Sequence, residues 1–551
     1  MELANTLLLS LNDLLTFKIM AFMAMGVVCG LIAGSIPGFT ITMAVVLTLP
    51  FTFGMSPVQG LSTMLGVYVG GLTGGMFSAA LMGIPGTPSA ISTTFDAFPM
   101  SRQGRPGLAL GLGLWSSFLG GIISSVLLLI MAPSLAAIGL EFGPWDYFML
   151  VIFALTIAAS LSEGDLVKGL IAGVFGLLFA SVGVDNINGA KRLTFGIEEL
   201  DSGFSFLPVL IGLFAFSQLL KDMNDVKGSR KPMMQGPRNV VRLEHLAALK
   251  AIAIRKISVL RAAAIGIFIG LLPAAGSSIS NILAYDQEKK ASPHPEKFGT
   301  GIPEGIIASE TANNATAGGA LITMMALGIP GDAVTAVMLG ALTIHNIAPS
   351  PTFISTEPRL AYALMLAYLL ANLWMLFLTS ASLRVFLWIT RVPLYILGVV
   401  ILMYCAMGVF TLNNSVTDIW TLLLFGVLGL VMQRFGFPLT PMVLGVVLGP
   451  IAETNLSRAI STNDDWSLFL TRPWSQFFWV MAIFSVLYTI HQNLQRQGSK
   501  GLPYLGAALM ASLALPLLRM DDPIRLGAGV LLVLLALRSG WRVLHNSKES
   551  S

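Results

Sequence analysis

The chain has 551 residues, of which 55% are hydrophobic and only 11% charged, against roughly 25% charged in an average soluble domain. The net charge of +4 comes from 32 basic and 28 acidic residues. The excess basic residues lie in short polar connections and do not form a continuous basic surface that could bind the phosphates of a nucleic acid. The composition therefore excludes nucleic acid as a partner and predicts a chain surrounded by lipid.

Long apolar runs cover most of the chain. A membrane helix uses about 20 apolar residues, so we expect an all-α, polytopic membrane protein with on the order of twelve to fourteen transmembrane helices. We expect residues 1–18 to form a half-amphipathic entry helix. We expect no cleavable signal peptide, because a basic n-region is missing. The last apolar runs, at roughly 503–518 and 524–543, resemble an appended hairpin.

A basic polar segment, residues 221–261, lies between the apolar runs. It carries ten lysines and arginines against three acids, which predicts a cytoplasmic loop. We therefore divide the chain into four parts: an N-terminal membrane repeat (1–220), the basic cytoplasmic loop (221–261), a C-terminal membrane repeat (262–470) and appended C-terminal transmembrane helices (471–551).

Two motifs of the first half recur in the second, which predicts an internal repeat. Two glycines and a proline with the same spacing lie at Gly30, Gly34 and Pro37 and again, 236 residues later, at Gly266, Gly270 and Pro273. The tetrapeptide Gly-Ile-Pro-Gly at 83–86 recurs at 328–331, an offset of 245. A polar insert at 286–300 accounts for the difference of nine. Inverted orientation of the two repeats is an expectation from transporter folds.

Glycine and proline together interrupt four apolar runs, at 34–38, 83–88, 272–276 and 328–331. Proline has no N–H and clashes with the preceding turn, so each run breaks there. Freed backbone groups are tolerated within a membrane where they bind a solute or line a water-filled cavity. Half-helix N-termini present N–H groups that suit a carboxylate. A single break is more often a packing kink, but four in symmetric positions favour a site.

The predicted substrate-binding residues are those of the breaks and the hydroxyl residues beside them. They are Ser35, Pro37, Gly38, Thr40, Gly83, Pro85, Gly86, Thr87, Pro273, Gly276, Ser277, Ser278, Gly328, Pro330 and Gly331.

Acidic residues within the apolar parts are rare and point to function. Glu310 lies in a polar patch where Asn313 and Asn314 could supply carbonyl oxygens to a coupling cation. Asp332 follows the fourth break, where binding Na⁺, accepting a proton and capping a helix are all open. We place Asp96 on a solvated loop at a membrane edge.

The remaining reactive residue types give no pattern for catalysis. Cys29 and Cys405 lie in apolar runs as packing residues, and the five histidines show neither metal spacing nor a partnered nucleophile. Walker-type glycine motifs are absent from the sequence. We therefore predict no enzyme activity and no cofactor apart from a coupling ion, Na⁺ or H⁺.

The motifs together resemble the large membrane (permease) subunit of the tripartite tricarboxylate transporters, TctA-type, over roughly residues 15–470. The matching segments are 34–38, 68–75, 83–88, 272–277, 303–314 and 328–331. The resemblance implies a multi-pass permease of the bacterial cytoplasmic (inner) membrane. Its implied partners are a small four-span membrane subunit and a periplasmic solute-binding protein that delivers a small carboxylate, and an ion gradient drives uptake.

The predicted function is thus binding-protein-dependent secondary transport of tricarboxylates or dicarboxylates. An ion channel could also use broken helices, and a purely structural membrane subunit is disfavoured by the symmetric breaks. A membrane-embedded enzyme would need a partnered nucleophile or a metal cluster. Which carboxylate is carried, and whether Na⁺ or H⁺ drives its uptake, both stay open.

Overall fold

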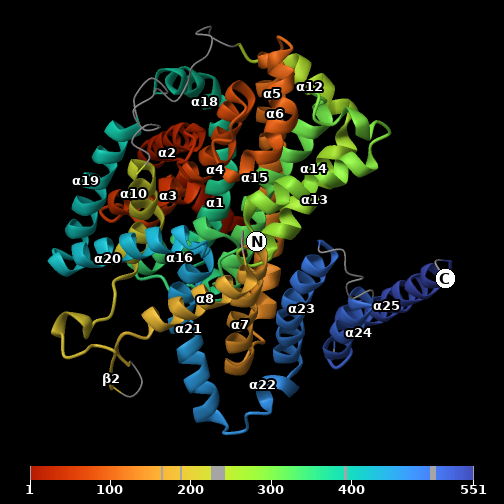
Figure 1. Cartoon of the computed structure of the whole chain (residues 1–551). Coiled ribbons are helices and arrows are strands. Elements are labelled where there is room, and N and C mark those ends of the chain that lie inside the picture. The colour runs from red at the N-terminus through yellow and green to blue at the C-terminus, as the bar shows by residue number, and fades with distance from the viewer. Residues whose placement is uncertain are drawn as a thin grey trace. The chain divides into compact units, whose positions relative to one another are not determined.

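The computed structural model describes residues 2–162, 165–185, 189–224, 242–389, 394–496, 504–520 and 522–549. These residues are mostly helical (Figure 1). One antiparallel ladder pairs β1 (Gly183–Val184) with β2 (Lys191–Arg192). The predicted all-α class is confirmed. Residues 225–241 of the basic loop, and Glu163, lie outside the described residues.

Within the described ranges, nine helices are long and apolar enough to cross a membrane. These candidate spans are Phe17–Ser35, Pro57–Met82, Pro106–Gly139, Pro144–Leu161, Pro358–Ser382, Val416–Arg434, Leu439–Thr462, Pro473–Leu494 and Pro523–Trp541. Shorter apolar helices accompany them. The multi-pass membrane class is therefore confirmed, whereas twelve to fourteen spans stays a prediction.

The chain forms two compact units, each made of two stretches of sequence. Unit 1 comprises Met1–Leu140 and Ile197–Phe435, and unit 2 comprises Glu141–Gly196 and Gly436–Ser551. The units group residues by contact, so the predicted four-part division of the sequence stays a prediction.

Unit 1 holds all four predicted breaks. Its first stretch contains α1 (Glu2–Leu14), α2 (Phe17–Ser35), α3 (Ile41–Thr52), α4 (Pro57–Met82), η1 (Pro88–Ala90), α5 (Ile91–Arg102) and α6 (Pro106–Gly139). Its second stretch contains η2 (Glu198–Leu200), α9 (Phe206–Leu210), η3 (Ile211–Phe216), α10 (Ser217–Asn224), α12 (His245–Ile254), α13 (Lys256–Leu271), α14 (Gly276–Ala291), η4 (Pro295–Lys297), α15 (Pro303–Leu327), α16 (Ala333–Ile344), α17 (Phe353–Thr356), α18 (Pro358–Ile389), α19 (Leu394–Asn413) and α20 (Val416–Arg434).

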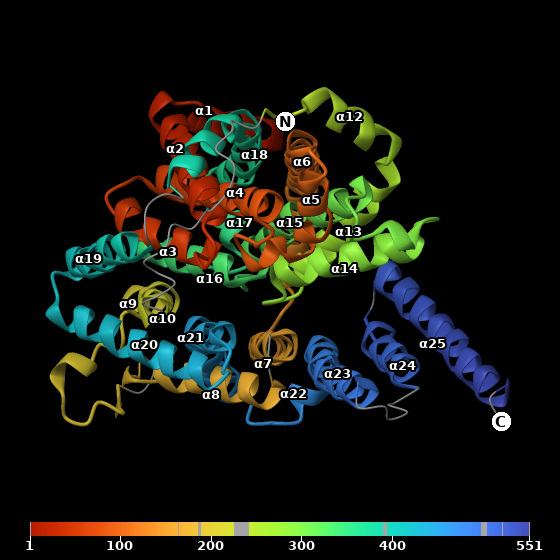
Figure 2. The same ribbon diagram turned by 45° about the horizontal axis from the view of Figure 1, so that its top comes forward.

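Helices α4 and α15 form the buried centre of unit 1. Helix α4 packs against α2, α3 and α18, whereas α15 packs against α6, α13 and α14 (Figure 2). In α15 every residue from Gly305 to Ala326 is buried. Because protein surrounds both helices, they can carry polar side chains that a lipid-facing helix could not.

Glycines bring the helix pairs of unit 1 into backbone contact. Gly30 of α2 lies against the carbonyl of Val67 in α4, and Gly70 of α4 lies against the carbonyl of Val27. Gly270 of α13 lies in the same way against the carbonyl of Thr316 in α15. A Cβ at any of these glycines would overlap the facing backbone, so the small residues permit the close crossing.

The described residues of unit 2 form seven helices besides the β ladder. They are α7 (Pro144–Leu161), α8 (Leu166–Ala180), α21 (Leu439–Thr462), α22 (Leu468–Thr471), α23 (Pro473–Arg496), α24 (Leu505–Leu517) and α25 (Pro523–Glu549). Helix α21 packs against α7 and α8, and α23 packs against α7 and α24, which in turn packs against α25. The close contact of α8 and α21 again uses glycines, Gly176 and Gly445.

Candidate functional site

The first two predicted breaks interrupt helices in the structure. Helix α2 ends at Ser35 and α3 begins at Ile41, where the hydroxyl of Thr40 accepts a hydrogen bond of 3.1 Å from the Met43 N–H as an N-cap. Helix α4 ends at Gly83, whose φ of +70° lies in the left-handed region. A short turn then leads through η1 into α5.

The third and fourth breaks lie at corresponding ends of helices. Helix α13 ends at Leu271 and α14 begins at Gly276, after a turn in which Ala274 has a φ of 60°. Helix α15 ends at Gly328, which has the same φ of +70° as Gly83. The first glycine of each Gly-Ile-Pro-Gly tetrapeptide therefore makes the same left-handed helix end.

The breaks meet in pairs. Gly86 of the second break lies against the carbonyl oxygen of Gly34 in the first. Gly331 of the fourth break lies against the carbonyl oxygen of Gly270, where the chain enters the third. A Cβ added to Gly276 would also lie 3.9 Å from the Cβ of Asp332. Each half of unit 1 thus brings its two interruptions into contact.

Helices that follow the breaks connect one pair with the other. Helix α5 packs against α14, and α16 packs against α3. Ser92 of α5 donates from its N–H to Oδ1 of Asn281 in α14, at 2.9 Å, and from its hydroxyl to the Asn281 carbonyl, also at 2.9 Å. The four interruptions therefore belong to one connected part of unit 1, although they are far apart in the sequence.

The predicted substrate-binding residues lie at these breaks with different exposure. Gly38 is exposed; the half-buried residues are Pro37, Thr40, Gly83, Pro85, Gly276, Ser277 and Ser278; the buried ones are Ser35, Gly86, Thr87, Pro273, Gly328, Pro330 and Gly331. The fourth break is thus the most enclosed. Contact of any of these residues with a substrate stays a prediction.

Glu310 lies inside α15 and is fully buried. Its Oε1 accepts a hydrogen bond of 2.6 Å from the hydroxyl of Thr93 in α5, and its Oε2 accepts one of 2.8 Å from Ser117 in α6. The sequence did not single out Thr93 or Ser117, because hydroxyl residues are common in membrane helices and their partner lies 217 and 193 residues away.

The two asparagines predicted near Glu310 bind helix α4. The Asn313 amide donates to the Leu72 carbonyl at 3.1 Å, and Thr73 donates its hydroxyl to Oδ1 of Asn314 at 3.2 Å. The polar patch of α15 therefore reaches α4, α5 and α6 within one buried layer. Its role in ion coupling stays a prediction.

Asp332 has the geometry of a helix cap, which was one of its predicted roles. Its Oδ1 accepts from the N–H and the hydroxyl of Thr335, each at 2.8 Å, at the start of α16. The hydroxyl of Tyr68 in α4 donates to its Oδ2. Tyr68 opens one of the segments that match the family, but its contact with Asp332 was not predicted, because the two residues lie 264 positions apart.

The interpretation of Asp96 as a solvated loop residue is wrong. Asp96 lies within α5 and is fully buried. Its Oδ1 accepts from the N–H groups of Gly299, Gly301 and Ile302 at 2.8–3.0 Å, and the Tyr285 hydroxyl donates to Oδ2 at 2.9 Å. The loop that enters α15 covers this carboxylate, and a contact of that kind has no local signature in the sequence.

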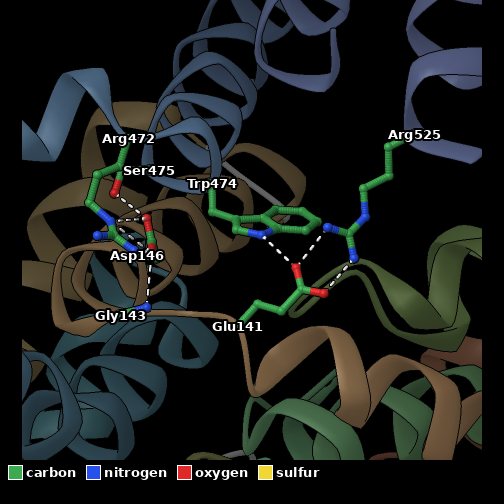
Figure 3. A network of polar contacts seen from close by, with 7 residues as sticks. All are labelled: Glu141, Gly143, Asp146, Arg472, Trp474, Ser475 and Arg525. Carbon is green, nitrogen blue, oxygen red and sulfur yellow. Dashed lines mark hydrogen bonds and ion pairs between the residues drawn. The ribbon is translucent and has the colours of Figure 1, made fainter. Parts of the chain in front are cut away.

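Unit 2 contains a separate polar network at the start of α7 (Figure 3). Asp146, whose side chain is 1% exposed, accepts from Arg472 at 3.0 Å and from the Ser475 hydroxyl at 2.5 Å. It also accepts from the N–H of Gly143 at 2.9 Å, which closes the first turn of α7. These hydrogen bonds and the ion pair link the start of α7 to the start of α23.

Glu141 extends the same network to α25 (Figure 3). Arg525 donates to both Glu141 oxygens, at 2.7 and 2.8 Å, and its guanidinium lies 5.1 Å from the centre of the Trp474 ring. The hydrogen bond from Arg525 lowers the pKa of Glu141 below its ordinary value. The sequence alone gave no reason to pair these residues.

Paired interruptions within the buried helices of a multi-pass chain are an architecture of membrane transporters. Comparison with known sequences makes the assignment specific: the chain belongs to the Tripartite tricarboxylate transporter TctA family, whose profile matches residues 20–444. It is thus a membrane transporter subunit of a tripartite system, as the motifs predicted, and such a system implies partner subunits. Helices α22–α25 lie beyond the matched residues.

Two relatives come from Agrobacterium vitis. The "Uncharacterized 52.8 kDa protein in TAR-I ttuC' 3'region" is 32% identical over 503 residues, which are 91% of this chain and 99% of the relative. The "Uncharacterized protein in TAR-II ttuC' 3'region" is 32% identical over 209 residues, 38% of this chain and 86% of the relative. No solved structure matches the chain significantly.

Proposed function

We propose that this chain is the permease subunit of a binding-protein-dependent secondary transporter that takes up small tricarboxylates or dicarboxylates across the bacterial cytoplasmic membrane. An ion gradient, of Na⁺ or H⁺, drives the uptake. The observation that carries the proposal is the pairwise contact of the helix breaks in unit 1, where Gly86 lies against Gly34 and Gly331 lies against Gly270.

The geometry of the breaks suits an anion. Helices α3, α14 and α16 begin directly after the first, third and fourth breaks, and α5 follows the second through η1. Their N-terminal N–H groups carry partial positive charge, which favours a carboxylate. No lysine or arginine is buried among the residues whose exposure the structure describes, so the proposed anion site consists of backbone N–H groups and hydroxyls.

Recurring contacts support the two proposed repeats. Gly74 lies against the Leu31 carbonyl, and Gly319 lies against the Ile267 carbonyl. The two residues of the second contact follow those of the first by 245 and 236 positions, the same offsets that separate the repeated motifs. Inverted orientation of the two repeats remains part of the proposal, as does the movement of this core that would alternate access.

The proposal includes the coupling ion and the partners. Glu310, Asn313, Asn314 and Asp332 are the candidate residues for Na⁺ or H⁺, because they are buried acids and amides within α15 and at the start of α16. A small membrane subunit and a periplasmic solute-binding protein complete the proposed transporter. Membrane lipid surrounds the candidate spans.

The test is uptake of radiolabelled citrate and dicarboxylates into proteoliposomes that contain this chain and its small membrane subunit. The purified binding protein is added outside, and a Na⁺ or a H⁺ gradient is imposed. Pro85→Ala, Glu310→Gln and Asp332→Asn are compared with the wild type, and we expect each to reduce uptake. Undiminished uptake in all three would remove the site assignment, and flux that neither saturates nor needs the binding protein would indicate a channel.

A further inference from the structure

Helix α12 of unit 1 is apolar but too short to cross a membrane. Its ten residues, His245–Ile254, make about 15 Å at 1.5 Å per residue, half of the hydrocarbon thickness of a bilayer. The helix is interrupted at Arg255, which has a φ of −110° and a ψ of 30°, and α13 begins after it. Helix α12 is therefore a separate element ahead of the longer α13.

One face of α12 is covered by α6. Ala248 and Ile252, one turn apart, are buried, and a Cβ added to Gly111 of α6 would lie 3.2 Å from the Cβ of Ala248. The indole N–H of Trp115 in α6 donates to Nδ1 of His245 at 3.3 Å. The packing against α6 thus fixes which side of α12 faces outward.

The outward face of α12 is an apolar stripe that contains one charge. Leu246, Lys250 and Ile254 follow one another at intervals of four, so they lie on the same side of the helix. Leu246 is 77% exposed, Ile254 is 81% exposed, and Lys250 between them is exposed as well. Exposed apolar residues continue along α13 at Ile257, Leu260 and Phe268. A stripe of this kind fits the boundary between lipid headgroups and acyl chains.

The acids nearest to this end of unit 1 are already occupied. Three of them form ion pairs within the described residues: Glu288 with Arg261 at 3.4 Å, Glu304 with Arg255 at 2.7 Å, and Asp286 with Lys290 at 2.5 Å. Glu244 lies on the side of α6, where a Cβ added to Gly107 would be 3.2 Å from its Oε1. These acids therefore leave the remaining bases unpaired.

Three exposed lysines at this end have no acid at ion-pair distance in the described part of the chain. They are Lys250, Lys256 and Lys289. Lys256 is the first residue of α13, and α13 packs against α14. Lys289 belongs to the last turn of α14 and follows Glu288, the partner of Arg261 in α13. The lysines of α13 and α14 thus lie at the same end of these two helices.

We propose that Lys250, Lys256 and Lys289 bind the headgroup of an anionic phospholipid, while Leu246 and Ile254 contact its acyl chains. Lysine can lay its stem along an apolar surface and extend its ammonium to the headgroup. The apolar residues on both sides of Lys250 favour a lipid over a free phosphate ion, which would leave them exposed to water. The predicted cytoplasmic side of residues 221–261 places the site in the leaflet that is rich in anionic lipid.

The proposed lipid site lies at one end of the helix that leads to the third break. Helix α13 runs from Lys256 to Leu271, and Gly270 near its other end lies against the carbonyl of Thr316 in α15. A lipid at Lys256 therefore holds the outer end of a helix whose inner end belongs to the paired breaks. Any effect of this lipid on uptake rests on the proposed function, but its binding does not.

The experiment measures the unfolding midpoint of the full chain, purified in dodecyl maltoside, during titration with dioleoylphosphatidylglycerol, dioleoylphosphatidylcholine or inorganic phosphate. We expect phosphatidylglycerol to raise the midpoint saturably, and the other two to have no such effect. Lys250→Gln and Lys256→Gln should each weaken the apparent affinity for phosphatidylglycerol about fivefold, which is the contribution of one lysine beside an anionic lipid.

A second double variant and a control separate the two parts of the site. Leu246→Asn with Ile254→Asn keeps every lysine and should also weaken the binding of phosphatidylglycerol. Lys297→Gln is the matched control, because Lys297 is exposed in η4 between Glu296 and the buried Phe298, away from the apolar stripe. It should bind phosphatidylglycerol as the wild type does. All the replaced side chains are exposed, so we expect each variant to fold.

Four results would overturn the proposal. The first is a wild type that phosphatidylglycerol stabilises no more than phosphatidylcholine does. The second is wild-type affinity in the double variant Lys250→Gln with Lys256→Gln. The third is equal stabilisation by inorganic phosphate, which would indicate a site for a free anion. The fourth is wild-type affinity in Leu246→Asn with Ile254→Asn, which would indicate that a protein partner covers the stripe.

Uptake into proteoliposomes, with the binding protein present, separates this inference from the proposed function. Stabilisation by phosphatidylglycerol without carboxylate uptake in any lipid mixture would support the lipid site and refute the transport proposal. Carboxylate uptake by a protein that phosphatidylglycerol does not stabilise would support transport and refute the lipid site.

Discussion

Two buried carboxylates, Glu310 in unit 1 and Asp146 in unit 2, have opposite surroundings. Asp146 accepts hydrogen bonds from the Arg472 guanidinium, a serine hydroxyl and a backbone N–H, so its charge is neutralised within the chain. Glu310 accepts hydrogen bonds from two hydroxyls and from the Asn313 amide, all of them neutral, and forms no ion pair within the described part of the chain. The comparison teaches that a buried acid can hold helices together either through an opposite charge, as Asp146 does, or through neutral hydrogen-bond donors alone, as Glu310 does.

The largest expected effect on stability follows from breaking the pair in unit 2. Arg472→Ala leaves the Asp146 carboxylate buried and unpaired, which should lower the free energy of unfolding by about 3 kcal/mol. Thermal unfolding in detergent measures the loss. The double variant Arg472→Ala with Asp146→Asn should recover most of it, because no uncompensated charge remains. Equal stability of the single variant and the wild type would show that Asp146 does not depend on Arg472.

A second variant tests the contact between helix breaks. Gly331→Ala places a Cβ against the Gly270 carbonyl, and 2.5 Å from the Cα of Ala320, so we expect a loss of about 1–3 kcal/mol and reduced carboxylate uptake. Gly506→Ala in α24 is the control, since an added Cβ there meets nothing within 4 Å. If both variants unfold and transport alike, the paired breaks are not closely packed.

Glu310→Gln should raise the free energy of unfolding, whereas Arg472→Ala should lower it. Removal of a buried charge that faces only neutral donors should stabilise the protein by about 1 kcal/mol. Thermal unfolding in detergent measures the effect. A destabilised variant would mean that the neutral donors compensate the charge of Glu310 as well as Arg472 compensates that of Asp146, and the contrast would fail.

The smallest effect concerns the ion pair of Glu141 with Arg525. Because Arg525 lowers the pKa of Glu141, the stabilisation is present above the ordinary carboxyl pKa and is lost as the pH falls through the lowered value. Glu141 is 46% exposed in this pair, so we expect at most about 0.5 kcal/mol. The unfolding midpoints of the wild type and of Glu141→Gln, measured above the ordinary carboxyl pKa and below the lowered pKa, test this prediction. If Glu141→Gln lost more stability relative to the wild type at low pH than at neutral pH, the predicted direction of the pH dependence would be wrong.

Much of the architecture could be predicted from the sequence because its causes are local. Long apolar runs indicate membrane helices whatever their neighbours are, and the proline and glycine at Pro37, Gly83, Pro273 and Gly328 interrupt a helix through their own backbone chemistry. The ends of α2, α4, α13 and α15 lie at these positions. The same motifs predicted the family, which the comparison confirmed.

The partners of the polar residues could not be predicted in this way. Asp96 reads as a loop residue beside Pro99, and only the folded chain lays the backbone of residues 299–302 over its carboxylate. Tyr68 and Arg472 likewise meet their acids across 264 and 326 residues of chain.

The sequence by itself thus determined the membrane class, the places where helices break and the family. Only the tertiary structure decided which breaks touch and which buried acids are compensated. The physical reason is that hydrophobicity and backbone chemistry act within a few residues, whereas the burial of a charge depends on what distant helices place around it. Thr93 beside Glu310, 217 residues away, is the clearest example.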